Sequence, residues 1–275
     1  MLIDAHAHLD LYEAELDAAL QQIALHRIFT ISNSLDLASY ERNLTIATSC
    51  PNALPIFGVH PWHASASAEH LPGLRKAIEQ SPMLGEIGLD YYFVKDAAEF
   101  PRQRKVFEYL LGAAREQGKI VHLHTKGAEA DVLSLLDRFG IGRAVVHWYS
   151  GPLDILHKLV ARGAYFTIGI EVRYSEHIQT IARAIPAERL LTETDNPGGA
   201  RSHIDGPGMP ALVLAVVDGL AEARKTTPTA IEQLVQANLL RLLCDDPWLS
   251  APYARLSTPS RTAAGATGRG RSAHG

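Results

Sequence analysis

Eight short apolar segments alternate with segments of helical pattern along most of this 275-residue chain. Strands that alternate with helices form a parallel sheet, because each helix returns the chain to the same end of the sheet. Eight such repeats in about 250 residues predict a single (β/α)8 barrel of the TIM type. An open, doubly wound sheet is the alternative, but no G-x-G-x-x-G motif follows the first strand.

The boundaries of these segments give the expected elements. The expected strands are Leu2–Ala5, Ile28–Ser32, Leu54–Val59, Met83–Gly88, Lys119–Leu123, Ala144–Val146, Ala164–Ile168 and Arg189–Glu193. The expected helices are Glu13–His26, Leu37–Ser49, His70–Gln80, Pro101–Gln117, Ala128–Phe139, Leu153–Arg162 and Glu176–Ala184, with Pro210–Lys225 and an extra C-terminal helix, Thr229–Cys244. From about Pro252 the chain is rich in small residues and arginine, which predicts disorder. We therefore expect a barrel over residues 1–248 and a disordered, Arg-containing tail over 249–275.

Composition narrows the class of protein. With 47% hydrophobic and 20% charged residues, the chain is able to bury a large core. No apolar stretch approaches the ~20 residues of a membrane span, and two cysteines form no disulfide framework, so we expect a cytoplasmic protein without a membrane partner. The net charge is -4, which argues against a broad basic surface for nucleic acid. A phosphate substrate would have to be attracted locally, for example by bound cations.

Histidines and carboxylates gather where the expected strands end. His6 and His8 share one face of the first strand because they are two residues apart. The other residues at strand ends are His60, Glu86, His122, His124, His147 and Asp195. In a TIM barrel the carboxyl ends of the strands meet on one face and carry the active site. Imidazole and carboxylate are metal ligands, so the sequence predicts a metal site on that face.

Several of these residues have other readings from sequence alone. His122 and His124 share one face of their strand, so one of them is a ligand and the other a core residue or supporting partner. His60 precedes a proline and is able to cap a turn, and Asp195 is able to act as a turn or N-cap residue.

Six sequence blocks together resemble the TatD family of metal-dependent deoxyribonucleases, a branch of the amidohydrolase-like barrels. They are His6-Ala7-His8, Gly58-Val59-His60-Pro61, Gly85-Glu86-Ile87-Gly88-Leu89-Asp90-Tyr91, Val121-His122-Leu123-His124-Thr125-Lys126, His147-Trp148-Tyr149-Ser150-Gly151 and Glu193-Thr194-Asp195-Asn196-Pro197. The blocks stand in the family's order, and the resemblance extends from Met1 to about Asp246.

The resemblance implies a site for two divalent cations, zinc, manganese, magnesium or iron. His124, which precedes a small and a basic residue, would be the strand-five ligand. One cation would be held by His6, His8, Glu86 and Asp195, the other by Glu86, His124 and His147, with Glu86 shared. Asp195 would also accept the proton of the attacking water, and His60 would hydrogen-bond the scissile phosphate or the leaving oxygen. Lys126 would contact phosphate as a point charge.

Departures from the family pattern lie around the substrate site. Lys126 stands where arginine is usual, and Trp148-Tyr149 is bulkier than usual, which predicts a stacking face for a base. Gly198–Pro210 replaces the family's Arg-Asn-x-Pro element, so the substrate mouth is expected to be remodelled. Asn238 matches a family asparagine with a structural role.

The leading functional hypothesis is a metal-dependent phosphodiesterase that acts as a 3'–5' exonuclease, with single-stranded DNA or DNA ends as its substrate and a monomer as the default state. The first alternative is an amidohydrolase of a small amide or ester. Many such enzymes bridge their metals with a modified lysine on strand four, where this chain has Glu86. The second is a barrel that serves as a subunit of a multi-protein assembly, such as a defence system.

Overall fold

All eight expected strands form in the computed structural model, which describes residues 1–244, 246 and 249. They are Leu2–Ala7 (β1), Ile28–Asn33 (β2), Ala53–Ile56 (β3), Leu84–Gly88 (β4), Val121–His124 (β5), Ala144–Val146 (β6), Tyr165–Ile168 (β7) and Leu190–Thr192 (β8). Strands β1–β3 form one parallel sheet, and β4–β8 form a second.

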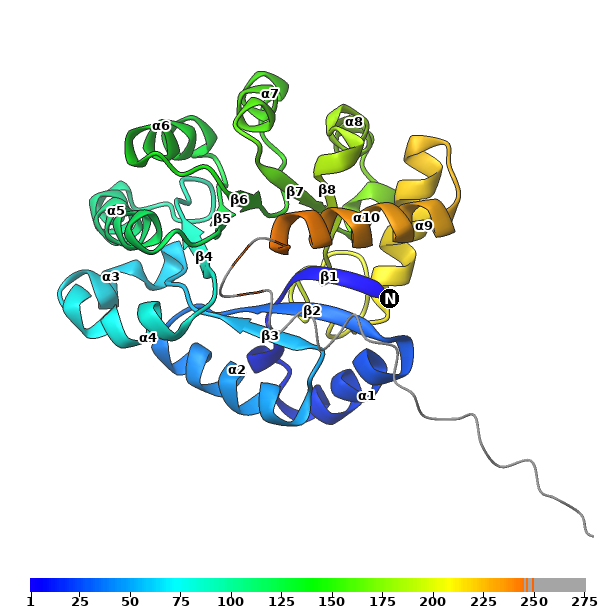
Figure 1. The fold of residues 1–275 in the computed structure, drawn as a ribbon, viewed down its shortest axis with the longest axis horizontal. Coiled ribbons are helices and arrows are strands. Elements are labelled where there is room, and N and C mark those ends of the chain that lie inside the picture. Colours follow the sequence, from blue (N-terminus) through cyan, green and yellow to red (C-terminus); the bar gives the residue numbers. More distant parts are fainter. Residues whose placement is uncertain (245, 247–248, 250–275) are drawn as a thin grey trace, which may run out of the picture.

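Two seams join these sheets into a TIM-like barrel (Figure 1). At the first, Phe57 pairs with Leu84 in a parallel bridge beside β3 and β4. At the second, the backbone N–H of Asp195 donates to His6 O, and that of His8 donates to Asn196 O, each at 2.8 Å. The predicted fold class is thereby confirmed, and the ends of β1 and β8 are brought together.

Helices surround the barrel in Figure 1, as the alternating pattern predicted. They are Leu16–His26 (α1), Leu37–Ser49 (α2), Ala64–Ala68 (α3), Arg75–Gln80 (α4), Phe100–Gln117 (α5), Glu129–Phe139 (α6), Leu153–Ala161 (α7), Glu176–Ala184 (α8), Leu212–Arg224 (α9) and Pro228–Leu243 (α10). Local chemistry sets many of these ends. The Asp36 carboxylate accepts from Ser39 N at the start of α2, and left-handed Gly118 ends α5.

The largest differences from expectation lie between β3 and β4. Strand β3 ends at Ile56 rather than Val59, because the chain there passes very close to β4: a Cβ on Gly58 would lie 2.3 Å from Glu86 O. The expected helix from His70 begins only at Arg75, since Pro72 and Gly73 hold the preceding turn in a 3-10 conformation. The short helix α3 was not expected. The predicted disorder after Pro252 lies outside the described residues.

Helix α10 packs against β1 and β8 and crosses one end of the barrel (Figure 1). Its buried Asn238 donates from Nδ2 to Ala187 O at 2.6 Å and to Leu190 O at 2.8 Å. This satisfies carbonyl groups at the start of β8, in agreement with the structural role expected of Asn238.

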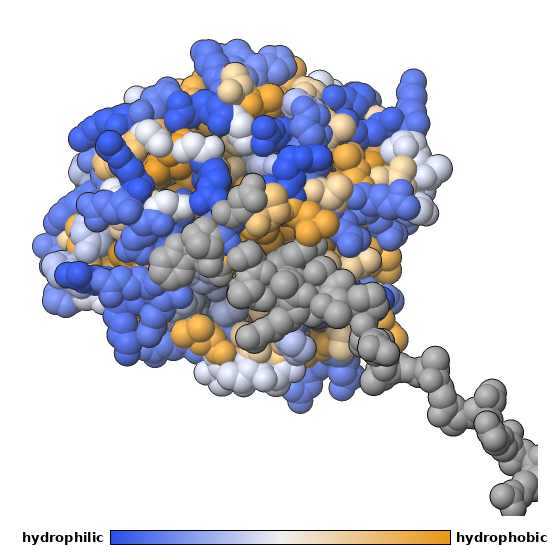
Figure 2. All heavy atoms as spheres, viewed as in Figure 1, coloured by the Kyte–Doolittle hydropathy of each residue, from blue (hydrophilic) through white to orange (hydrophobic). Residues whose placement is uncertain are grey.

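Hydrophilic side chains predominate over the outer helices on the face shown in Figure 2, with apolar side chains between them in smaller groups. None of the helices among the described residues is both long and apolar enough to span a membrane.

Candidate metal centre

The carboxyl ends of five strands bring six polar side chains together on one face of the barrel. His6 lies in β1 and His8 directly follows it. The others are Glu86 in β4, His124 at the end of β5, His147 after β6 and Asp195 after β8. All are buried except Asp195, whose side chain is 27% exposed. The sequence prediction that strand ends would assemble one site therefore agrees with their placement.

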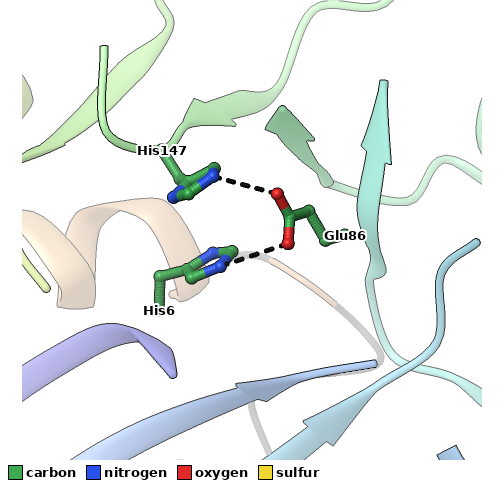
Figure 3. A group of neighbouring side chains, drawn as sticks. All are labelled: His6, Glu86 and His147. Carbon is green, nitrogen blue, oxygen red and sulfur yellow. Dashed lines mark ion pairs between the residues drawn. The ribbon is translucent and has the colours of Figure 1, made fainter. Parts of the chain in front are cut away.

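Glu86 is the centre of this group, and its two oxygens face different histidines. Oε2 lies 3.4 Å from both His6 Nε2 and His8 Nε2. Oε1 lies 2.8 Å from His124 Nδ1 and 2.9 Å from His147 Nε2. Figure 3 shows His6 and His147 directed at opposite oxygens, with their rings stacked at 3.8 Å between centroids. One carboxylate therefore separates the imidazoles into two sets.

Asp195 completes the set that contains His6 and His8. Its Oδ1 lies 3.2 Å from His8 Nε2 and 3.5 Å from His6 Nε2. The residue has a positive φ of 52°, a left-handed conformation that costs free energy for a non-glycine residue. The hydrogen bond from Asp195 N to His6 O fixes this turn. The strained backbone thus directs the carboxylate at the two histidines of β1.

The donor atoms fit divalent cations. His6, His8 and Asp195 offer ligand atoms within 4.8 Å of one another, and so do His6, Glu86 and His147. Such mixed imidazole and carboxylate sets suit zinc, manganese or iron better than calcium. The two oxygens of Glu86 allow one cation on each side. The resemblance implied that His6 shares its cation with His8, Glu86 and Asp195, whereas in the structure the ligand atom of His6 also lies within 4.8 Å of those of Glu86 and His147.

Outer partners orient the imidazoles so that a lone pair points inward. In each of three histidines the outer ring nitrogen donates to an acceptor, which leaves the inner nitrogen unprotonated when the ring is neutral. The pairs are His8 Nδ1 with Asn33 O at 3.2 Å, His124 Nε2 with Asp90 Oδ2 at 3.0 Å, and His147 Nδ1 with Glu193 Oε2 at 3.3 Å. These tautomers are the ones that metal ligation requires.

His60 has the opposite arrangement. Its Nδ1 accepts a hydrogen bond from Trp62 N at 3.2 Å, so the proton of the neutral ring sits on Nε2. Nε2 lies 3.4 Å from Glu86 Oε1 and 3.3 Å from His124 Nδ1. Burial lowers the pKa of His60 to about 4, so the ring is neutral at physiological pH. Although His60, Glu86 and His124 are close enough to hold a cation, the tautomer makes His60 a donor.

His122 lies behind the cluster rather than in it. It is fully buried, and its Nε2 is 3.2 Å from His6 Nδ1, the nitrogen that faces away from Glu86. Burial lowers the pKa of His122 to about 3. Gly85 is required beside it, because a Cβ there would lie 2.4 Å from the His122 Cβ. Of the two candidates on β5, His124 faces Glu86 and His122 supports His6.

The cluster binds protons in the absence of cations. Burial acts to raise the pKa of Glu86, but the surrounding imidazoles outweigh it and hold this pKa well below its usual range. Burial likewise acts to lower the pKa of His147, but Glu86 and Glu193 raise it to about 10. For His8, the Asp195 and Glu86 carboxylates outweigh burial and raise its pKa well above normal. A cation that binds here must therefore displace protons.

Three further residues were predicted to bind the substrate, Lys126, Trp148 and Tyr149, and each has a different environment in the structure. Lys126 is half-buried and donates from Nζ to Ser150 Oγ at 2.7 Å. Trp148, also half-buried, has a φ of 40° and donates from its indole nitrogen to Glu171 Oε2 at 2.8 Å. Tyr149 is buried, and its hydroxyl donates to Pro152 O at 2.6 Å. The expectation of a stacking face on Tyr149 is therefore corrected: its ring belongs to the core.

A cavity of about 340 Å³ opens above the donor atoms. Its floor is formed by residues of the metal cluster together with His60. Its remaining walls are Leu11, Leu35, Trp62, Phe93, Gly198 and Arg201. Sequence reasoning did not single out Trp62, Phe93 or the supporting carboxylates Asp90 and Glu193. The same signal that identified Glu86, a carboxylate at the end of an apolar strand, applies to both carboxylates.

Comparison with known proteins identifies relatives along nearly the whole chain. Residues 3–244 match the family described as TatD related DNase. An uncharacterised metal-dependent hydrolase of Escherichia coli K12, YcfH, is 28% identical over 253 residues, which cover 88% of this chain and 95% of the relative. The 3'-5' ssDNA/RNA exonuclease TatD of Pantoea vagans is 33% identical over 150 residues, 51% of this chain and 56% of that protein.

A solved structure of a TatD homologue supports the same family assignment. The crystal structure of YjjV, a TatD homologue from Escherichia coli K12, aligns with a TM-score of 0.79 and 26% identity, and covers 88% of this chain and 97% of that one.

Proposed function

Because this chain belongs to the TatD related DNase family and is a metal-dependent hydrolase, we propose that it cleaves phosphodiester bonds of DNA, as a 3'–5' exonuclease on single strands or strand ends. The observation that carries the proposal is the shared carboxylate Glu86, with imidazoles directed at each of its oxygens. The proposed polarity follows the Pantoea vagans relative, which is named as a 3'-5' ssDNA/RNA exonuclease.

We propose that these residues form two cation sites. His6, His8, Glu86 and Asp195 would hold one cation, and Glu86, His124 and His147 the other. Bound cations would neutralise phosphate charge and lower the pKa of a water molecule. Because the formal charge of the whole chain is -4, this local positive charge is what would draw a polyanion to the cavity.

Asp195 is the proposed proton acceptor. Its side chain is 27% exposed and lines the cavity, whereas that of Glu86 is 2% exposed. A general base has to reach the water that attacks the substrate. Both carboxylates line the cavity, but that of Glu86 is surrounded by imidazole nitrogens, whereas that of Asp195 is the more open of the two. We assign to Asp195 the removal of a proton from that water.

His60 is the proposed hydrogen-bond donor to the substrate. Its Nε2–H lines the cavity beside Glu86, and its Nδ1 is held by Trp62 N. A neutral imidazole donor there is able to bond a non-bridging phosphate oxygen or the leaving oxygen.

Two basic residues complete the proposed phosphate site. Arg201 lines the cavity, and no ion pair of its guanidinium appears among the described residues, so it is free to bind an anion. Lys126 is held near the cluster by Ser150, and burial lowers its pKa while nearby carboxylates oppose that change. Arg201 lies in the segment that departs most from the family pattern, and it supplies a bidentate cation that Lys126 does not.

The test is release of nucleotides from end-labelled single-stranded and duplex DNA by metal-stripped protein to which manganese, magnesium or zinc is added. We expect metal-dependent release that falls at least about 100-fold in Asp195→Asn, the range of general base catalysis. Asp218→Asn, an exposed aspartate on α9, is the matched control and should retain full activity. Absence of release with every metal, in protein shown to bind cations, would contradict the proposal and favour a small-molecule hydrolase.

A further inference from the structure

Two aromatic rings form one wall of the cavity above the metal cluster, and we define Trp62 and Phe93 as the aromatic wall. Trp62 lies in the turn after β3 and Phe93 in the loop after β4. Both line the cavity, yet 56% of Trp62 and 52% of Phe93 remain exposed. Large aromatic surface left open beside a polar site commonly marks a ligand-binding face.

The wall is fixed in position relative to the metal ligands. Asp90 Oδ2 accepts hydrogen bonds from the Trp62 indole at 2.7 Å and from His124 Nε2 at 3.0 Å. Asp90 Oδ1 accepts from the backbone N–H of Phe93 at 2.7 Å. One carboxylate therefore aligns a metal ligand with both members of the wall.

The two rings also support each other. Their centroids are 5.9 Å apart at an interplanar angle of 78°, an edge-to-face contact. Trp62 makes a second such contact with His60, at 4.7 Å and 82°. Preorganised rings lose little conformational entropy when a ligand binds. A planar apolar group would therefore meet a rigid aromatic face next to His60, the proposed hydrogen-bond donor to the phosphate.

We propose that the aromatic wall stacks an unpaired base of the nucleotide attached to the scissile phosphate. The inference rests on the proposed function and assigns the substrate class of the same site: strands whose terminal base is free to leave the helix stack. Stacking on aromatic rings tolerates every base, because each has a π-face. A paired terminal base would have to fray first, so single strands should be preferred over blunt duplexes.

Phe93→Leu is the most direct test, because it removes an aromatic ring without removing a hydrogen bond. The substrates are two single-stranded oligonucleotides that differ only in the terminal nucleotide, which carries either a base or an abasic tetrahydrofuran. We expect kcat/KM to fall about five- to fiftyfold for the base-bearing end and less than about twofold for the abasic end. Phe93→Tyr keeps the ring and should restore activity. Tyr174→Leu removes a ring that is 59% exposed outside the cavity and should change neither value.

The outcomes separate this inference from the proposed function. Suppose the enzyme cleaves both oligonucleotides, and Phe93→Leu lowers kcat/KM equally for both or for neither. That result would overturn the proposal that the aromatic wall stacks a base, and it would leave the nuclease proposal intact. If the unmodified protein with bound metal cleaves neither, the nuclease proposal fails and the wall fails with it. A loss of kcat/KM confined to the base-bearing end, with activity restored in Phe93→Tyr, supports both the base-stacking proposal and the nuclease proposal.

Discussion

Replacing Glu86 by glutamine should remove the shared ligand while retaining nearly the same side-chain shape. The carboxylate of Glu86 lies within 3.4 Å of nitrogens from His6, His8, His60, His124 and His147. An amide in its place offers one neutral oxygen, and its NH2 group faces imidazoles as a donor. The group made by His6, His8 and Asp195 does not include Glu86. The variant should therefore retain at most one cation site.

The size of the effect follows from linkage. A cation present at about 100 times its Kd stabilises the folded protein by ~2.7 kcal/mol, so two independent cations contribute ~5 kcal/mol. For a domain of about this size each kcal/mol changes the Tm by ~2–4 °C. Adding cations to the metal-stripped protein should raise the Tm by ~10–20 °C. In Glu86→Gln the rise should be no more than about half of that.

Differential scanning fluorimetry with and without zinc or manganese measures this rise, and elemental analysis gives the cations bound per chain. Comparing each protein with its own metal-free form cancels any change in intrinsic stability. Glu69→Gln, on an exposed position after α3, is the matched control and should behave as the unmodified chain. Two cations per chain and an undiminished rise in Glu86→Gln would refute the shared-ligand reasoning.

Three further predictions follow from the same structure. Glu193→Gln should weaken cation binding about 10–100-fold, because the Glu193 carboxylate orients His147; an unchanged affinity in a chelator competition would contradict this. Asn238→Ala should lower the free energy of unfolding by about 2–4 kcal/mol in urea titrations, since two carbonyls near β8 lose their donor, and a change below ~0.5 kcal/mol would argue against that role. Burial lowers the pKa of Lys119 to about 8, so between pH 8 and pH 10 the unfolded chain holds a proton that the folded chain has released. The free energy of unfolding should therefore rise with pH over this range. Lys119→Met should flatten the rise, and an unchanged slope in the variant would show that Lys119 does not cause it.

The order of the strands was predictable because each is a short apolar run bounded by helical segments. Helices α2 and α8 and strand β6 have the expected boundaries. The region from Val59 to Gln80 was less predictable, since its backbone is set by contacts between distant segments, such as the approach of Gly58 to Glu86. Local pattern contains no information on such a contact.

The metal ligands were predictable for a topological reason. Parallel strands place their carboxyl ends together, so residues such as His6, Glu86 and Asp195, far apart in sequence, had to converge. Hydrogen-bond direction was not predictable. That His60 Nδ1 accepts from Trp62 N, which makes His60 a donor toward the cavity, depends on the geometry of a turn.

The stacking residues were the least predictable part of the site. Trp148 and Tyr149 follow a ligand directly, as an exposed platform would, but Tyr149 turns into the core and the Trp148 indole bonds Glu171. Trp62 and Phe93 are separated by 31 positions and meet through Asp90. An aromatic residue in a loop has no periodicity to show which way it faces.

Anomalous diffraction at the zinc or manganese edge from metal-loaded crystals would test the two-cation centre most directly. We predict two peaks about 3.5–4 Å apart on either side of the Glu86 carboxylate. One should lie beside His6, His8 and Asp195, the other beside His124 and His147, with His60 Nε2 outside the ~2.0–2.2 Å ligand distance of both. A single peak, or a cation bound to His60 instead of shared through Glu86, would contradict the account.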